Sequence, residues 1–294
     1  MKEIRYILLF IITCNAAFAQ IPEKEKGALI DLYTSTNGKK WTKSWDLSKS
    51  VSMWYGVEVE NNTVVSLNLI QNNLSGSLPS SLGSLKNLRV LNLAFNDIQG
   101  AFPDRLVSLK KLQVLRLGKN KISGTIPKKI GNLKKLEVLD FFSNKLSGTI
   151  PKSIAKMKHL KILSLSNNAF IGNIPEELGE LKYLERLELA DNEIEGEIPL
   201  AISGLSNLNT LVLTKNNLSG KFPSSIFSLP KLRVLQIQNN GFDKNHMKNS
   251  IPVKTDLALF DFEDIDDKVK NDNIRNGFLR KDVRTADTKF EDVD

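Results

Sequence analysis

The residue types that carry out most proton-transfer and nucleophilic chemistry are scarce in this chain. Its 294 residues include one cysteine, Cys14, and two histidines, His159 and His246. No serine, histidine and aspartate arrangement, metal-ligand spacing or phosphate-binding glycine loop stands out around them. We therefore predict that the protein is not an enzyme and that it holds no metal ion and no cofactor.

Two sets of carboxylates are candidates for ion binding or acid–base chemistry. Asp264, Asp266 and Asp267 lie close together, but they lack the glycine and the distal glutamate of a calcium-binding loop. Asp140 and Glu188 occupy the same position of a repeated block of sequence, two blocks apart, in strands that we expect to face water. Neither set is sufficient to predict a catalytic or metal site.

A block of 24 residues recurs eight times in this chain. The structure that this block forms therefore determines where the side chains within it lie. Each block contains the pattern LxLxxN, as in residues 91–96. The asparagines that close the pattern are Asn72, Asn96, Asn120, Asn144, Asn168, Asn192, Asn216 and Asn240. In the first seven blocks a glycine follows four residues later, and a proline follows three residues after that glycine. A fixed period of this length with this leucine spacing is typical of a leucine-rich-repeat solenoid.

The whole block reads LxxLxxLxLxxNxLxGxIPxxLxx, which resembles the plant-specific subclass of leucine-rich repeats. Proteins of this subclass include plant receptor-kinase ectodomains and many secreted bacterial proteins. The resemblance covers roughly residues 64–242. It implies an α/β solenoid, a curved superhelix of about eight repeats with a parallel β-sheet on its concave face. It also implies recognition of a protein or peptide and not catalysis.

The residues themselves predict the same architecture. In Leu91-Asn92-Leu93 the alternation indicates a strand with its leucines inside and the residue between them outside. An inward asparagine can bond backbone groups that the turning chain would otherwise bury unpaired, so we expect a ladder of stacked asparagines. The glycine permits a backbone conformation that a side chain disfavours, and the proline fixes the next bend.

We expect specificity to be determined by the outward positions of the strands. Phe95 and Phe142 are predicted to be exposed on either side of Gly118. Aromatic and arginine side chains around a small residue are typical of binding hot spots. The predicted ligand site on the concave face therefore consists of Phe95, Arg116, Lys119, Asp140 and Phe142. The alternative is that Phe142 only packs against its neighbours.

The chain has a net charge of +8, and lysines recur at one position of the repeat. They are Lys86, Lys110, Lys134, Lys158 and Lys182. With repeats ~4.8 Å apart, these lysines would form a basic stripe. The stripe could attract an acidic polysaccharide, a lipopolysaccharide phosphate or an acidic protein, or it could be only a solvated surface. Nucleic acid is not an expected partner, because the stripe has no interleaved aromatic residues.

The start of the chain predicts export. A basic beginning, an apolar stretch from Tyr6 to Cys14 and the sequence Ala17-Phe18-Ala19 are typical of a signal peptide cleaved after Ala19. No segment is long enough to span a membrane after cleavage. We predict a secreted, periplasmic or cell-surface protein. The alternative is a lipoprotein anchored through Cys14, although the residues before it fit a lipobox poorly.

The predicted segments are a signal peptide at 1–19, an N-terminal cap at 20–63, leucine-rich repeats at 64–243, a C-terminal cap at 244–262 and a charged, disordered tail at 263–294. The N-terminal cap should contain a helix around residues 23–35 and all three tryptophans. These tryptophans either cover the open end of the core or form a sugar-binding platform. A final strand is expected within residues 257–262.

These expectations define two candidate functions. The first is an exported, non-catalytic recognition module that binds a protein or peptide through the concave face. The second is a cell-surface adhesion or structural protein that binds acidic glycan through the lysine stripe. Binding through the stripe should weaken steeply as salt rises.

Overall fold

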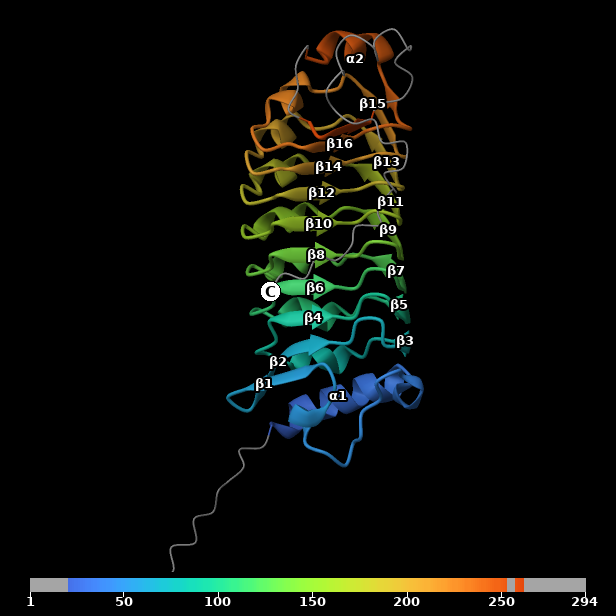
Figure 1. Ribbon diagram of the computed structural model, residues 1–294, viewed down its shortest axis with the longest axis vertical. Coiled ribbons are helices and arrows are strands. Elements are labelled where there is room, and N and C mark those ends of the chain that lie inside the picture. The colour runs from blue at the N-terminus through green and yellow to red at the C-terminus, as the bar shows by residue number, and fades with distance from the viewer. Residues whose placement is uncertain (1–20, 253–256, 262–294) are drawn as a thin grey trace, which may run out of the picture.

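The computed structural model describes residues 21–252 and 257–261. In this part of the chain, successive turns of the solenoid stack along one axis, with the N-terminal helix at one end and a short helix at the other (Figure 1). The predicted signal peptide at 1–19, the alternative lipid anchor at Cys14 and the predicted tail at 263–294 lie outside the described residues. The three acidic residues Asp264, Asp266 and Asp267 also lie outside them.

One sheet of ten strands, here called the concave sheet, contains one short strand from each turn (Figure 1). Its strands are β1 (Val57–Glu60), β2 (Thr63–Asn68), β4 (Val90–Asn92), β6 (Val114–Arg116), β8 (Val138–Asp140), β10 (Ile162–Ser164), β12 (Arg186–Glu188), β14 (Thr210–Val212), β16 (Val234–Gln236) and β18 (Leu259–Asp261). From β2 to β16 the strands are parallel and each residue pairs with the one 24 positions later. The sequence period therefore becomes a spatial register, and equivalent side chains lie in rows across the sheet.

A second parallel sheet, which the sequence analysis did not predict, follows the ladder asparagines on another side of each turn (Figure 1). Its strands are β3 (Ser75–Ser77), β5 (Asp97–Ala101), β7 (Lys121–Thr125), β9 (Lys145–Thr149), β11 (Ala169–Asn173), β13 (Glu193–Gly196), β15 (Asn217–Gly220) and β17 (Gly241–Phe242). Leu146 in β9 is buried and is followed by Gly148, whose φ of +76° suits a residue without a side chain.

Short 3₁₀ helices follow the prolines, and each carries a buried leucine or isoleucine of the core. They are η3 (Ser80–Ser84), η4 (Asp104–Ser108), η5 (Ile130–Asn132), η6 (Lys152–Lys156), η7 (Glu176–Glu180), η8 (Leu200–Gly204) and η9 (Ser224–Ser228). Their buried apolar residues join those of both sheets in one continuous core that runs through the stack. Each turn thus covers the apolar faces of its neighbours, which is how a solenoid gains stability.

The column of asparagines connects the backbone of successive turns. Asn144 is representative: its amide nitrogen donates to the carbonyl oxygens of Leu117, at 3.0 Å, and Phe141, at 3.1 Å, and its Oδ1 accepts from the N–H of Ile122, at 2.9 Å. Asn72 instead bonds the cap, because its Oδ1 accepts from the N–H of Lys43 at 2.6 Å.

The N-terminal cap closes one end of the core. Helix α1 (Glu23–Ser35) occupies the segment where a helix was expected, with η1 (Gly38–Lys40) and η2 (Val51–Met53) after it. Trp41, Trp45 and Trp54 are at most 4% exposed, and their indole N–H groups donate to backbone carbonyls at 2.8–3.0 Å. Buried rings with satisfied N–H groups cover the core, and they do not offer the exposed faces of a sugar platform.

A hairpin connects this cap to the first repeat. Strand β1 pairs antiparallel with β2, and the turn between them uses Asn61 and Asn62, both with positive φ. The buried side chain of Glu25 accepts from the N–H of Val64 at 2.8 Å, so α1 is bonded directly to the concave sheet. The segment boundary predicted at 63/64 therefore falls within β2.

The other end of the core is closed by α2 (Lys244–Ser250) and β18. Asp243 caps α2 by accepting from the N–H of His246 at 3.0 Å. Strand β18 pairs parallel with β16, within the segment where the sequence predicted a final strand. The second histidine, His246, lies here with Nε2 3.1 Å from the carbonyl oxygen of Phe222.

Candidate binding surface on the concave sheet

The third residue of each short concave strand forms what we call the central row. From β4 to β16 it contains Asn92, Arg116, Asp140, Ser164, Glu188, Val212 and Gln236. Because pairing is in register, Asp140 lies between Arg116 and Ser164. Asp140 and Glu188 are two strands apart, as predicted, with Ser164 between them.

Asp140 is the most electrostatically unusual member of the central row. Only 6% of the surface of Asp140 is exposed, and its Oδ1 accepts a hydrogen bond from the N–H of Phe142 at 3.0 Å. Burial raises the pKa of the Asp140 carboxyl to about 6, although the N–H of Phe142 and the charge of Arg116 act in the opposite direction. The negative charge of Glu188 raises this pKa further, and the positive charge of Arg186 lowers it.

Gly118 provides the space that this carboxylate occupies. A Cβ at residue 118 would lie 3.0 Å from Oδ1 and 3.2 Å from Oδ2 of Asp140, closer than side chains ordinarily pack. Gly118 does not have a positive φ, so its backbone does not itself require glycine. We infer that the glycine serves to let the Asp140 carboxylate lie against the backbone of the preceding turn.

The prediction that Phe142 is exposed is wrong. Only 9% of Phe142 is exposed, whereas Phe95 is 37% exposed. The Nζ of Lys119 lies 5.0 Å from the centre of the Phe142 ring, within range of a cation–π contact. Neighbouring turns are so close that the Lys119 side chain of one turn lies over the Phe142 ring of the next. Phe142 therefore lies beneath the surface and contributes little exposed area to it.

Phe95 and Lys119 are not strand residues, contrary to the predicted register. They lie after the three-residue strands and have φ values of 58° and 54°. The same left-handed conformation recurs just before the ladder asparagine at Ser143, Asn167, Asp191, Lys215 and Asn239. The chain bends sharply here to turn the asparagine inward. Phe95 and Lys119 consequently project from the ends of the strands, beside the central row.

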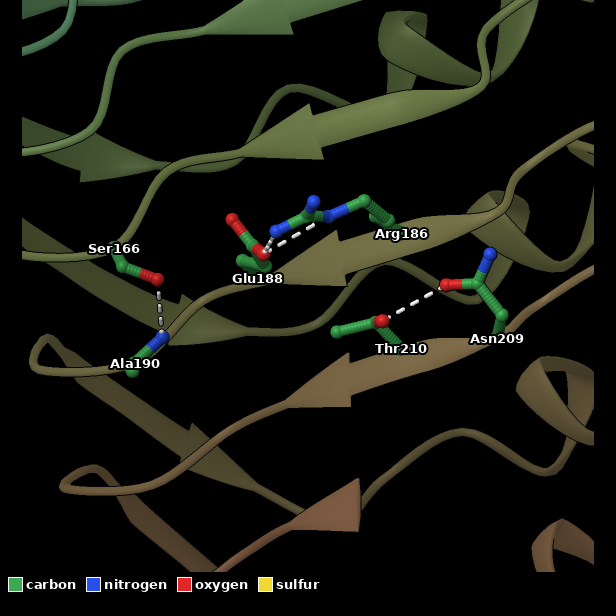
Figure 2. Close-up of polar contacts among 6 residues, drawn as sticks. All are labelled: Ser166, Arg186, Glu188, Ala190, Asn209 and Thr210. Carbon is green, nitrogen blue, oxygen red and sulfur yellow. Dashed lines mark hydrogen bonds and ion pairs between the residues drawn. The ribbon is translucent and has the colours of Figure 1, made fainter. Parts of the chain in front are cut away.

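In the later repeats, several polar side chains at the concave sheet bond other side chains or the backbone of the protein itself (Figure 2). Arg186 bonds Glu188 through both Nε, at 3.1 Å, and Nη2. The hydroxyl of Ser166 accepts from the N–H of Ala190 at 2.9 Å, and Thr210 donates to Oδ1 of Asn209 at 2.8 Å. The sequence predicted that the strand of Glu188 faces water, but it did not reveal that Glu188 pairs with Arg186.

The predicted lysine stripe lies between the 3₁₀ helices and the concave strands, and its five side chains are exposed. Several of them contact the protein itself. Lys158 forms an ion pair with Glu180 at 2.6 Å, and Lys86 donates to the hydroxyl of Ser108 at 2.8 Å. Lys182 donates to the carbonyl oxygen of Gly179 at 3.0 Å. The ion pair compensates the charge of Lys158, whereas the bonds of Lys86 and Lys182 to neutral groups leave their positive charges in place.

A hollow lies between the second sheet and the 3₁₀ helices, with a volume of about 1290 Å³. Thr125, Thr149 and Asn173 line it from the sheet, and Lys152 and Glu176 line it from the helices. The hollow could not be predicted from the sequence, because it depends on the second sheet, which was not expected.

Among the residues that the structure describes, no group of three or more histidine, cysteine or acidic side chains could hold a metal ion. His159 lies at an exposed position and stacks on Tyr183, with ring centres 6.3 Å apart. Among the same residues, no helix is sufficiently long and apolar to cross a membrane.

The chain matches a family model described as a leucine-rich repeat region, over residues 65–165 and 142–253. A comparison with curated protein sequences finds no match.

Similar solved structures include the PEPR1–AtPEP1 complex, with 32% identity and a TM-score of 0.68 over 75% of this chain and 32% of that one. The Arabidopsis receptor kinase HAESA, in complex with the peptide hormone IDA and the co-receptor SERK1, is 37% identical, with a TM-score of 0.58 over 61% and 31%. A plant ice-binding protein is 27% identical, with a TM-score of 0.73 over 83% and 79%. The chain thus spans only about a third of the two receptor structures.

Proposed function

We propose that this chain, which belongs to the leucine-rich repeat family, is a non-catalytic module that binds a peptide or an extended protein segment along its concave sheet. The observation that carries the proposal is the central row. Inside the solenoid one asparagine recurs in every turn, whereas the central row presents a different side chain from each turn. Solved structures of similar receptors contain AtPEP1 or the peptide hormone IDA, which supports a peptide as the ligand.

The spacing of the central row suits an extended polypeptide. Parallel strands lie ~4.8 Å apart, so a peptide crossing them meets a new side chain about every 5 Å. Arg116 and Asp140 would contact it from the row, and Phe95 and Lys119 from the ends of the strands. Phe142 would hold Lys119 in place from below and would not contact the peptide directly.

We further propose that the protein acts after export. The support is the predicted signal peptide, and the expected location is the extracellular space, the periplasm or the cell surface. Mass spectrometry of the exported protein should give Gln20 as the first residue. A diacylated Cys14 at the N-terminus would establish the lipoprotein alternative instead.

A selection from a random peptide library on the mature chain tests the proposed function. The informative variant is Phe95→Ser with Lys119→Asn, because Ser143 and Asn167 occupy the same left-handed position in other turns. These substitutions should therefore preserve the fold. We expect them to weaken binding of an enriched synthetic peptide at least tenfold, as for hot-spot residues.

The matched control is Thr149→Asn in the hollow beside the second sheet, because Asn173, 24 residues later, is the equivalent residue of the next turn. This control should leave peptide affinity unchanged. Failure of the selection to enrich any peptide, or an equal loss in both variants, would contradict binding along the concave sheet.

The lysine stripe favours a second candidate, binding of an acidic polysaccharide, because its five lysines are exposed in one column. Heparin can serve as the probe. Binding through the stripe should fall steeply between about 50 and about 500 mM salt, because the screening length shortens from more than ~10 Å to less than ~8 Å over that range. Heparin binding that survives high salt, or no binding at low salt, would argue against the stripe as a glycan site.

A further inference from the structure

We propose that the concave site selects a peptide with a cationic side chain, whose guanidinium or ammonium group binds the carboxylate of Asp140. This inference rests on the proposed function and adds the chemical class of the residue that is recognised.

The position of Asp140 is the first argument. It lies at the centre of the predicted site, with Arg116 before it in the row and Ser164 after it. The Phe142 N–H holds one oxygen, and Gly118 is the residue on which the carboxylate packs. The carboxylate is thus fixed in advance, which reduces the entropy lost when a ligand binds.

The partners of the neighbouring charges are the second argument. Glu188 is bonded by Arg186 on the same strand, so its charge is compensated within the protein. Asp140 receives its hydrogen bond from a neutral N–H group, and Arg116 acts on it through its charge. A buried carboxylate favours a cationic partner, because an ion pair offsets part of the cost of removing the charge from water.

The surrounding charges determine the pH dependence of this contact. Arg116 acts on Asp140 from β6, Arg186 and Glu188 act from β12, and the neighbouring β10 contributes the neutral Ser164. Burial raises the pKa of Asp140 to about 6. Only about a tenth of the carboxyl is then ionised at pH 5, so a cation that needs the ionised form should bind about tenfold more weakly there than at pH 7.5.

The test uses the full mature chain and the synthetic peptide enriched by the library selection at pH 7.5. A second version of the peptide replaces its arginine by citrulline, which keeps the shape and removes the charge, or its lysine by norleucine. Asp140→Asn should weaken binding of the cationic peptide at least tenfold, as expected for a lost bond to a charged group. Asp140→Asn should not weaken binding of the neutral peptide any further. Its affinity for the cationic peptide should no longer differ between pH 5 and pH 7.5.

Glu180→Gln serves as the control, because Glu180 is an acid outside the central row that is already paired with Lys158. It should retain the preference for the cationic peptide and the pH dependence. Enriched peptides that lack arginine and lysine, or that bind Asp140→Asn as tightly as the natural protein, would overturn the inference. If such peptides still respond to Phe95→Ser with Lys119→Asn, the proposed function stands while this inference fails. If no peptide is enriched, both fail together.

Discussion

The ladder asparagine and the central row lie four residues apart in each turn, yet they vary in opposite ways. The ladder has the same residue in eight turns, whereas from β4 to β16 the central row has seven different residue types. Each ladder asparagine between Asn96 and Asn240 bonds the carbonyl of its own turn and that of the preceding turn. Repetition therefore stabilises the fold, and the adjacent row is free to vary for recognition.

The same comparison can be made in energetic terms. The amide of Asn144 is fully engaged with backbone groups, so its burial is compensated within the protein. The carboxyl of Asp140 is more deeply buried than Asn144, and burial raises its pKa. A side chain that costs stability in the free protein is what we expect at a binding site. Substitutions at the two positions should accordingly change stability in opposite directions.

The largest effect should come from Asn144→Ala. It leaves the N–H of Ile122 without its acceptor. The carbonyls of Leu117 and Phe141 each lose one hydrogen bond but keep the one from Asn120 or Asn168. An unsatisfied buried group costs ~1–3 kcal/mol and each lost hydrogen bond ~0.5–1.5 kcal/mol, so the free energy of unfolding should fall by roughly 2–6 kcal/mol. Urea denaturation measures this change. Ser143→Asn is the matched control, because the equivalent Asn167 already has the same left-handed conformation. A similar loss in the control would show that the ladder is not the main source of stability.

The sequence predicted the features that repetition imposes. The 24-residue period predicted the stacking of turns, the concave sheet and the inward asparagines, because each depends on a pattern repeated in every block. The helix α1 was also expected, from the apolar spacing of Leu29, Leu32 and Tyr33. The second sheet was missed, although alternation around Leu146 and Gly148 could have indicated a strand.

The properties of individual side chains in the site were harder to predict. Phe142 was expected to be exposed and Asp140 to face water, but both are more than nine-tenths buried. Their burial depends on side chains from adjacent turns, such as Lys119, and on the missing side chain of Gly118. A repeat pattern specifies which way a residue points, but it does not specify which neighbours cover it. Phe95 and Lys119 were misplaced for another reason, since the bend before the asparagine has no single residue type.

The next effect has the opposite sign. Asp140→Asn should stabilise the protein at neutral pH. The folded-state pKa is about 6 and the usual value is 3.8, so the folded protein binds more protons in this window. Stability therefore falls as pH rises from ~4 to ~6, by at most about 3 kcal/mol at ~1.4 kcal/mol per pKa unit. Urea denaturation at pH 7.5 and pH 3.5 should show a gain for Asp140→Asn only at the higher pH. The same gain at both values would mean that the carboxylate charge is not its cause.

A smaller effect is expected just before the ladder. Asn167 has a φ of 57°, a conformation that asparagine tolerates and alanine disfavours. Asn167→Ala should destabilise the protein by ~1 kcal/mol, and Asn167→Gly should cost less than that, because glycine adopts positive φ readily. The sequence alone would have predicted almost no cost, since the side chain was expected only to point outward. Equal unfolding midpoints for the alanine and glycine variants would argue against backbone strain at this position.

The smallest effect should come from the lysine stripe. The ion pair between Lys158 and Glu180 joins side chains that are 53% and 61% exposed. Exposed pairs contribute ~0–1 kcal/mol because water and salt screen them, so Lys158→Gln should change the free energy of unfolding by about 0.5 kcal/mol or less. Lys134→Gln, at another exposed lysine of the same column, provides the matched comparison. Urea denaturation at low and high salt should give nearly the same result for both variants. A loss above ~1 kcal/mol that disappears in high salt would show that the stripe stabilises the fold, and the division between a stabilising interior and a surface free to vary would then fail.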